Sequence, residues 1–310
     1  MKKRLYVLPL AFISILGLAG CSFIPGLNGL SRRTNNASKP RYYDPEPIID
    51  NQIGEVTYGI YPQTRVLDDD LIDDLTKLKS PTINDWYLYN GEYYAKMVGQ
   101  YTDTTDSETY WSKNFANGEE LVPGQLYWFK CEPVLWDIQE YNDGVYTLLS
   151  RYSLNTHIYD DDDNNYADSD IRVWLNGEFC DALFSFTNTK YLLESSVDNS
   201  ADQTDSESAD LACQNTDDKV YIPSYKDVGG DGYVRGTFTA DITDYAFATG
   251  AYKDPNSDNA SYWLRSPSKA NYAGRTKAAA HFIYYNGYLD KWDVDATDVA
   301  IRPMIKIELD

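Results

Sequence analysis

Three short turn sequences restrict this chain to antiparallel β-structure more strongly than any other feature of it. Each has an Asn-Gly or Asn-Asp-Gly core between two stretches rich in apolar residues, and Asn-Gly is the strongest short signal for a type I′ hairpin turn. The predicted hairpins cover residues 86–98 around Asn90-Gly91, residues 125–150 around Asn142-Asp143-Gly144, and residues 279–292 around Asn286-Gly287. Antiparallel sheets are therefore expected in the first, middle and last thirds of the chain.

Helices are expected to be few and short. Leu71, Leu75 and Leu78 share one face of a predicted helix over residues 68–79, which opens with aspartates and closes with lysines. Ser169 is a predicted N-cap for a second helix, with Ile171, Trp174, Leu175 and Phe179 on one side. Further strands are predicted at residues 54–60, 219–222, 262–265 and 300–309, and residues 198–218 read as an exposed loop. Strands and long helices do not alternate, so the expected class is α+β with mixed, mainly antiparallel sheets.

The N-terminus predicts export and a lipid anchor. Three bases at residues 2–4 precede an apolar run at residues 5–18, which suits a signal peptide and is short for a membrane span. Residues 18–21, Leu-Ala-Gly-Cys, resemble the lipobox at which bacterial lipoproteins are cleaved and acylated. The expected organisation is a signal peptide at 1–20, a lipidated Cys21 with a flexible tether at 21–50, and one globular domain at 51–310. An ordinary secretory signal with an incidental cysteine is the alternative.

The net charge of the chain limits the classes of partner that it can bind. The formal net charge is −21, and removal of the leader with its three bases leaves −24. Such a chain repels nucleic acid, so the expected contacts are the bilayer, through the Cys21 acyl chains at the extracytoplasmic face of the cell membrane, and a glycan or surface protein. Cys131, Cys180 and Cys213 remain; one pair among them could bridge, and the sequence does not choose it.

Several uncommon sequence motifs along the chain (the family motifs) resemble one family of bacterial extracellular domains, the domain of unknown function 6273. They are GIYPQT at 59–64, YWFKCEPVLW at 127–136, LLSRYSLN at 148–155, NNYADSDIRVWLN at 164–176, VDNS at 197–200, WLRSP at 263–267 and IRP at 301–303. The resemblance implies one domain from residue 54 onward and supplies no chemistry. At the level of fold, the chain also resembles C-type-lectin-like and formylglycine-generating-enzyme-type domains, but it lacks that enzyme's C-terminal cysteines.

Several residues are candidates for a metal or ligand site, and each of them could instead have a purely structural role. Asp160, Asp161 and Asp163 lie in an oxygen-rich run that calcium favours, although solvent alone could satisfy them and no other cofactor is expected. The arginines and tryptophans inside the family motifs are expected to be structural. These residues are Arg172, Trp174, Trp263, Arg265 and Arg302. The alternative is that the arginines bind an anionic ligand. His281 is expected to be a packed or hydrogen-bonded strand residue.

Tyrosine is the most unusual part of the composition, with 28 tyrosines beside 7 tryptophans. Such side chains offer rigid contact area with a polar tip, which suits sugars and protein surfaces. The predicted ligand-binding group comprises Trp86, Tyr89, Tyr285, Tyr288 and Trp292. The first functional hypothesis is therefore a non-catalytic binding module for carbohydrate or protein. The alternatives are a hydrolase of cell-wall or glycan material that uses paired carboxylates, and a purely structural envelope component.

Overall fold

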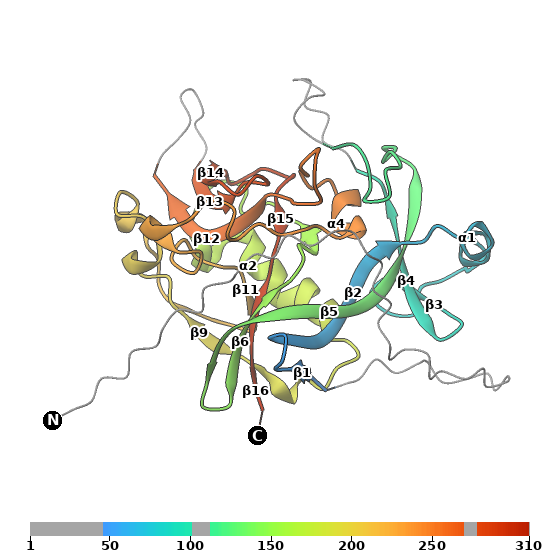
Figure 1. Cartoon of the computed structure of the whole chain (residues 1–310), viewed down its shortest axis with the longest axis horizontal. Helices are drawn as coiled ribbons and strands as arrows, with labels where there is room; N and C mark the ends of the chain where they lie inside the picture. The colour runs from blue at the N-terminus through green and yellow to red at the C-terminus, as the bar shows by residue number, and fades with distance from the viewer. Residues whose placement is uncertain (1–45, 101–111, 270–277, 310) are drawn as a thin grey trace. The chain divides into compact units, whose positions relative to one another are not determined.

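The long strand β5 (Leu126–Asn142) is the centre of the larger sheet (Figure 1). The computed structural model describes residues 46–100, 112–269 and 278–309. One edge of β5 pairs with β2 (Glu55–Arg65), and the other pairs with β4 (Glu92–Val98) and then with β6 (Val145–Ser150). The other strands of this sheet are β1 (Ile48–Asp50), β3 (Trp86–Tyr89), β8 (Leu192–Leu193), β11 (Val220–Tyr221) and β16 (Met304–Glu308). All pairings within it are antiparallel.

A second sheet of five strands carries the C-terminal hairpin. Its order is β14-β13-β12-β15-β7, with only the β12–β15 pair parallel. Its strands are β7 (Asn155–Thr156), β12 (Tyr262–Ser268), β13 (Ala279–Ile283), β14 (Leu289–Asp293) and β15 (Ala300–Ile301). Strands β9 (Ser195–Val197) and β10 (Thr216–Asp218) form a separate antiparallel pair.

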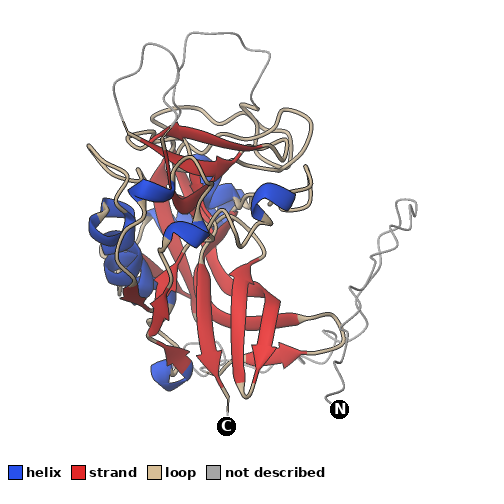
Figure 2. Cartoon of the chain, turned by 90° about the vertical axis from the view of Figure 1, so that its left-hand side faces the viewer, coloured by secondary structure: helices blue, strands red, loops and turns tan. Residues whose placement is uncertain are grey.

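The helices are short and few beside the strands (Figure 2). The α-helices are α1 (Asp69–Thr76), α2 (Asp170–Trp174), α3 (Cys180–Leu183) and α4 (Asp244–Ala248), and a π-helical turn, Leu175–Phe179, joins α2 to α3. Five 3₁₀ turns complete the list: η1 (Tyr166–Asp168), η3 (Thr189–Tyr191), η4 (Ala201–Gln203), η5 (Ala209–Leu211) and η6 (Gly230–Gly232). No helix of the described residues has the length and apolar character needed to cross a bilayer.

The predicted turns and caps account for where these elements begin and end. Asn90 and Gly91 both have positive φ, 50° and 82°, as a type I′ turn requires. Asp68 caps α1, and the Ser169 hydroxyl accepts from the Arg172 amide at the start of α2. The predicted α+β class with mainly antiparallel sheets is confirmed.

The core lies between the sheets and the α2–α3 segment, where Trp136 and Trp263 are fully buried. Cys131, Cys180 and Cys213 form no disulfide bond with one another in the part of the chain that the structure describes. Burial raises the pKa of Cys180 to about 11, which keeps this thiol protonated at neutral pH. The three cysteines therefore contribute as small packed side chains.

The prediction that residues 198–218 form an exposed loop is wrong in part. Thr204 and Ser208 are buried, and the Thr204 hydroxyl donates to the Pro267 carbonyl at 2.8 Å. Asp218, in β10, is also buried and accepts from Arg172 Nε at 2.7 Å. Polar residues can be buried when each is hydrogen-bonded. The low hydrophobicity of residues 198–218 was therefore not sufficient to predict that they are exposed to solvent.

Candidate functional site

The five aromatic residues predicted to bind ligand do not form one platform. Trp86 is buried, with its ring edge-on to Tyr61, so its inclusion in the predicted ligand-binding group is wrong. The reason is that the β3–β4 hairpin turns this side chain toward the core, where Phe186 also packs against it. Tyr89 is partly buried and donates from its hydroxyl to Asp74 at 2.5 Å. These two residues belong to the nine-stranded sheet, apart from the other three.

The remaining three aromatic residues lie within the β13–β14 hairpin, Tyr285 and Tyr288 in its turn and Trp292 in β14. Tyr288 is 49% exposed, but the Arg235 guanidinium lies over its ring, 3.6 Å from the centroid. Tyr285 is partly buried and packs against Tyr252, and Trp292 is partly buried against the main core. Only Tyr288 of the predicted five is strongly exposed, which does not provide a contiguous aromatic surface.

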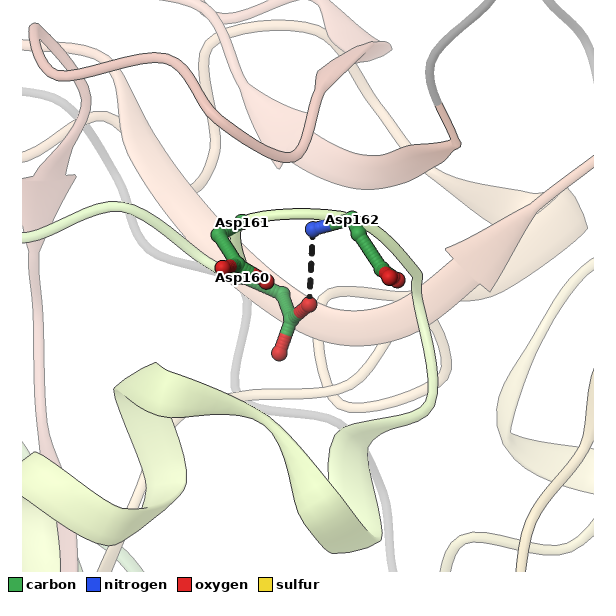
Figure 3. Close-up of side chains that lie close together, drawn as sticks. All are labelled: Asp160, Asp161 and Asp162. Carbon is green, nitrogen blue, oxygen red and sulfur yellow. Dashed lines mark hydrogen bonds between the residues drawn. The ribbon is translucent and has the colours of Figure 1, made fainter.

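The acidic run at residues 160–163 is a hydrogen-bonded loop. Asp160 Oδ1 accepts from the amides of Asp162 and Asp163 at 3.0 Å each, and Figure 3 shows the first of these bonds. Asp160 Oδ2 accepts from the Asp170 amide at the start of α2. Carboxylate oxygens of Asp160, Asp161 and Asp162 lie within 4.8 Å of one another, whereas Asp163 caps the Asn165 amide. Calcium binding at this loop stays a prediction.

The arginines of the family motifs form hydrogen bonds with segments that are distant in the sequence. Arg265 donates to the Ile222 carbonyl and to Asp227 at 2.7 Å. Arg302 donates to the Ser150 carbonyl at 2.8 Å. Arg172 pairs with Asp218, and burial raises the pKa of that carboxyl against the opposing effect of its hydrogen bonds. Each of these guanidinium groups donates to protein carbonyls or carboxylates, as a structural role requires, although the buried Arg265 Nε has no partner among the described residues.

A polar pocket of about 340 Å³ lies beside the β13–β14 hairpin. It brings together residues from four segments of the chain: 205–208, 225–231, Ser268 of β12, and the β13–β14 hairpin. Its lining includes Asp205, Glu207, Tyr225, Asp231, His281 and Lys291. His281 and Lys291 face each other across the β13–β14 ladder, while the others come from loops near η4, η5 and η6. The pocket thus joins sheet residues to the polar segment at 198–218.

A hydrogen-bonded pair, a buried histidine and a partly buried carboxylate, forms the floor of this pocket. His281 Nε2 lies 2.6 Å from Asp205 Oδ2, and the histidine side chain is only 8% exposed. Burial lowers the pKa of His281 below its ordinary value of 6.5, and the Asp205 carboxylate opposes only part of that effect. Burial also acts to raise the pKa of Asp205, but hydrogen bonds from Ser208 and His281 outweigh it, and the pKa is lowered. The pair is therefore a neutral imidazole beside an ionised carboxylate at neutral pH.

Both oxygens of Asp205 are fully engaged. Oδ1 accepts from the amides of Glu207 and Ser208, and Oδ2 accepts from the Ser208 hydroxyl as well as from His281. The Ser208 hydroxyl in turn accepts from the Lys269 amide at 3.0 Å. This network holds the pocket floor in one arrangement before any ligand arrives.

Tyr225 forms a wall of the pocket. Its ring packs on His281 with centroids 4.9 Å apart, and its hydroxyl donates to Asp231 at 2.9 Å. Burial, followed by the influence of Asp231, raises the pKa of Tyr225 to about 12. Gly230 has a φ of +54° and approaches this ring so closely that an added Cβ would lie 3.3 Å from Tyr225 Cε1. A glycine at that position lets the η6 turn close over the tyrosine.

The family model described as "Domain of unknown function (DUF6273)" matches residues 143–309. The chain belongs to this family. The match includes Asp205, Tyr225 and His281, so the pocket lies within the DUF6273 domain. The family motifs at 59–64 and 127–136 precede the matched region, which begins later in the chain than the resemblance implied. No curated protein and no solved structure matches the chain, so the C-type-lectin-like likeness stays a prediction.

Sequence reasoning found one half of the hydrogen-bonded pair and missed the other. His281 is a packed, hydrogen-bonded strand residue, as its place in an alternating stretch suggested. Asp205 was concealed among 48 acidic residues, inside a segment interpreted as exposed. The one available signal was the rarity of histidine, since the chain contains only two.

Proposed function

We propose that this protein is an exported, lipid-anchored binding module for carbohydrate or protein, and that the pocket around His281 and Asp205 is its ligand site. The leader and the cysteine at position 21 support export and anchoring. The observation that carries the ligand site is the pre-ordered pocket floor, in which Asp205 is held by four hydrogen bonds. A site whose polar groups are fixed in advance loses little conformational entropy when a ligand binds.

The hydrolase alternative receives less support from the same pocket. A glycosidase needs a carboxylic acid whose pKa is raised so that it can donate a proton at neutral pH. The pKa of Asp205 is shifted in the opposite direction, and its oxygens are occupied by protein donors. Asp218 is a carboxyl with a raised pKa, but it is fully buried against Arg172 rather than placed in the pocket.

A binding screen with a matched pair of tyrosine variants tests the proposal. The mature chain with Cys21→Ser would be applied to a glycan array and used to capture envelope proteins. Tyr225→Ala removes the pocket wall, whereas Tyr141→Ala removes a tyrosine that is 60% exposed and outside the pocket. We expect a ligand that is retained by the Tyr141→Ala form and lost by the Tyr225→Ala form. Equal retention by both forms, with both correctly folded, would place the ligand site elsewhere.

A further inference from the structure

We propose that the pocket selects ligands that carry an ammonium group, such as an amino sugar or a primary amine. This inference rests on the proposed function, because it names the chemistry of the ligand that the same pocket takes. It follows from three properties of the lining: its charge, the direction of its hydrogen bonds, and the aromatic face beside it.

The charge of the lining favours a cation. The carboxylates of Asp205, Glu207, Asp231 and Asp290 face one ammonium group, that of Lys291, and His281 is neutral. The described lining therefore has a formal charge of −3. Such a pocket repels anions such as phosphate and attracts small cations, and the attraction weakens as salt screens it.

The hydrogen bonds of the pocket leave acceptors rather than donors. An ionised Asp205 can only accept, so its bond to His281 places the ring proton on Nε2. Nδ1 of this ring is buried, so the acceptors that a ligand can reach are the exposed carboxylates of Glu207 and Asp231. The Tyr225 hydroxyl already gives its proton to Asp231. A ligand group with several donors and no acceptor complements this lining, and an ammonium group offers three donors.

The Tyr225 ring adds a surface that suits the same group. The tyrosine is held at its hydroxyl by Asp231 and at its amide by Ser266 Oγ, at 2.8 Å. A cation over an aromatic face is attracted by the negative charge at the centre of the ring, and the attraction is stronger where water is excluded. A tyrosine whose hydroxyl is bonded to a carboxylate at the rim of a pocket combines this face with the charge that attracts the cation.

Paired amine and amide probes test the inference. The mature full-length chain in detergent would be titrated at pH 7 with glucosamine against N-acetylglucosamine, and with n-butylamine against N-butylacetamide. Each pair differs by loss of the ammonium charge upon acetylation. We expect each amine to bind at least about tenfold more tightly than its amide, with affinity falling as salt rises.

Isosteric charge variants connect the preference to the pocket. Glu207→Gln and Asp231→Asn each remove one carboxylate charge from exposed side chains that line the pocket. Each is expected to weaken amine binding several-fold and to leave amide binding little changed. Asp70→Asn, an exposed aspartate on α1 outside the pocket, serves as the control and should have no effect.

The outcomes separate this inference from the proposed function. If amines and amides bind equally and Tyr225→Ala weakens both, the ammonium preference is wrong and the pocket remains the ligand site. If no amine binds at millimolar concentration, the ammonium preference is also wrong. If amines bind but Glu207→Gln, Asp231→Asn and Tyr225→Ala all leave the affinity unchanged, the proposed ligand site fails with it.

Discussion

At the residue scale, the same side-chain types serve different purposes according to what surrounds them. Asp218 is buried against Arg172, Asp160 holds the backbone of its own loop, and Asp205 orients a histidine in a pocket. The tryptophans at positions 174 and 263 of the family motifs also differ in burial and in their contacts. Trp263 is fully buried and donates from Nε1 to the His157 carbonyl at 3.0 Å, while Trp174 is partly buried and stacks on the His157 ring.

We predict that Trp263→Ala lowers the free energy of unfolding by about 3–5 kcal/mol, because it leaves a large cavity in the core. Trp174→Ala should cost clearly less, since solvent can reach the vacated site. Urea unfolding of both variants and the parent chain measures the difference. Equal losses for the two variants would contradict the difference in burial.

Acid should destabilise the fold through the hydrogen-bonded pair of His281 and Asp205. The pKa of His281 is lowered from 6.5, so the unfolded chain binds this proton more readily and stability falls as the pH drops below that value. The pKa of Asp205 is lowered from 3.8, so its contribution is present above pH 3.8 and is lost as the pH falls through the folded value. Both effects have the same sign.

The prediction is that His281→Gln flattens the loss of stability just below pH 6.5, because the histidine no longer titrates. Urea midpoints measured from pH 7.5 to pH 4 would show it, with His157→Gln as the control. A pH profile that is unchanged in the His281→Gln form and flattened in the control would assign the effect to the wrong histidine.

At the scale of elements, glycines with positive φ determine how strands bend and pack. Gly59 lies where the register of β2 against β5 shifts between Thr57 and Ile60, the signature of a β-bulge. Its φ is +77°, and an added Cβ would lie 2.9 Å from the Leu183 carbonyl at the end of α3. The bulge thus allows β2 to pass closely beneath α3.

We predict that Gly59→Ala is more destabilising than Gly54→Ala. Gly54 has a similar φ of +70° but nothing within 4 Å of the added Cβ, so its substitution costs only the left-handed strain of about 1–2 kcal/mol. Gly59→Ala adds a clash with backbone that cannot rotate away. Thermal and urea unfolding of the two variants tests this; a loss no larger at Gly59 would mean that α3 shifts freely.

At the scale of the whole molecule, the proposed export and anchoring would place the pocket outside the cytoplasm. The leader, Cys21 and the tether up to residue 45 lie outside the described residues, so the lipid anchor stays a proposal. We predict that intact-mass analysis finds an acylated N-terminal cysteine, and that Cys21→Ser releases the protein from membranes. A Cys21→Ser form that loses its leader but remains wholly in the membrane fraction would contradict the anchor.

Features that depend on local backbone geometry were predictable from the sequence alone. Asn90-Gly91 predicted a hairpin because positive φ at both positions is accessible to that pair, and Ser169 predicted a helix start because its hydroxyl reaches an orphan amide. Apolar alternation and the lack of long helices then led to the correct α+β class with antiparallel sheets.

Tertiary packing sets which face of each element is exposed to water and which distant residues contact each other. Trp86 lies in a correctly predicted hairpin, yet its burial depends on Tyr61 and Phe186, which belong to other segments. Asp205 and His281 are 76 positions apart, and no local pattern relates them. Neighbours on a strand point to opposite faces, so the burial of either face is a property of what packs on it, which only the folded chain supplies.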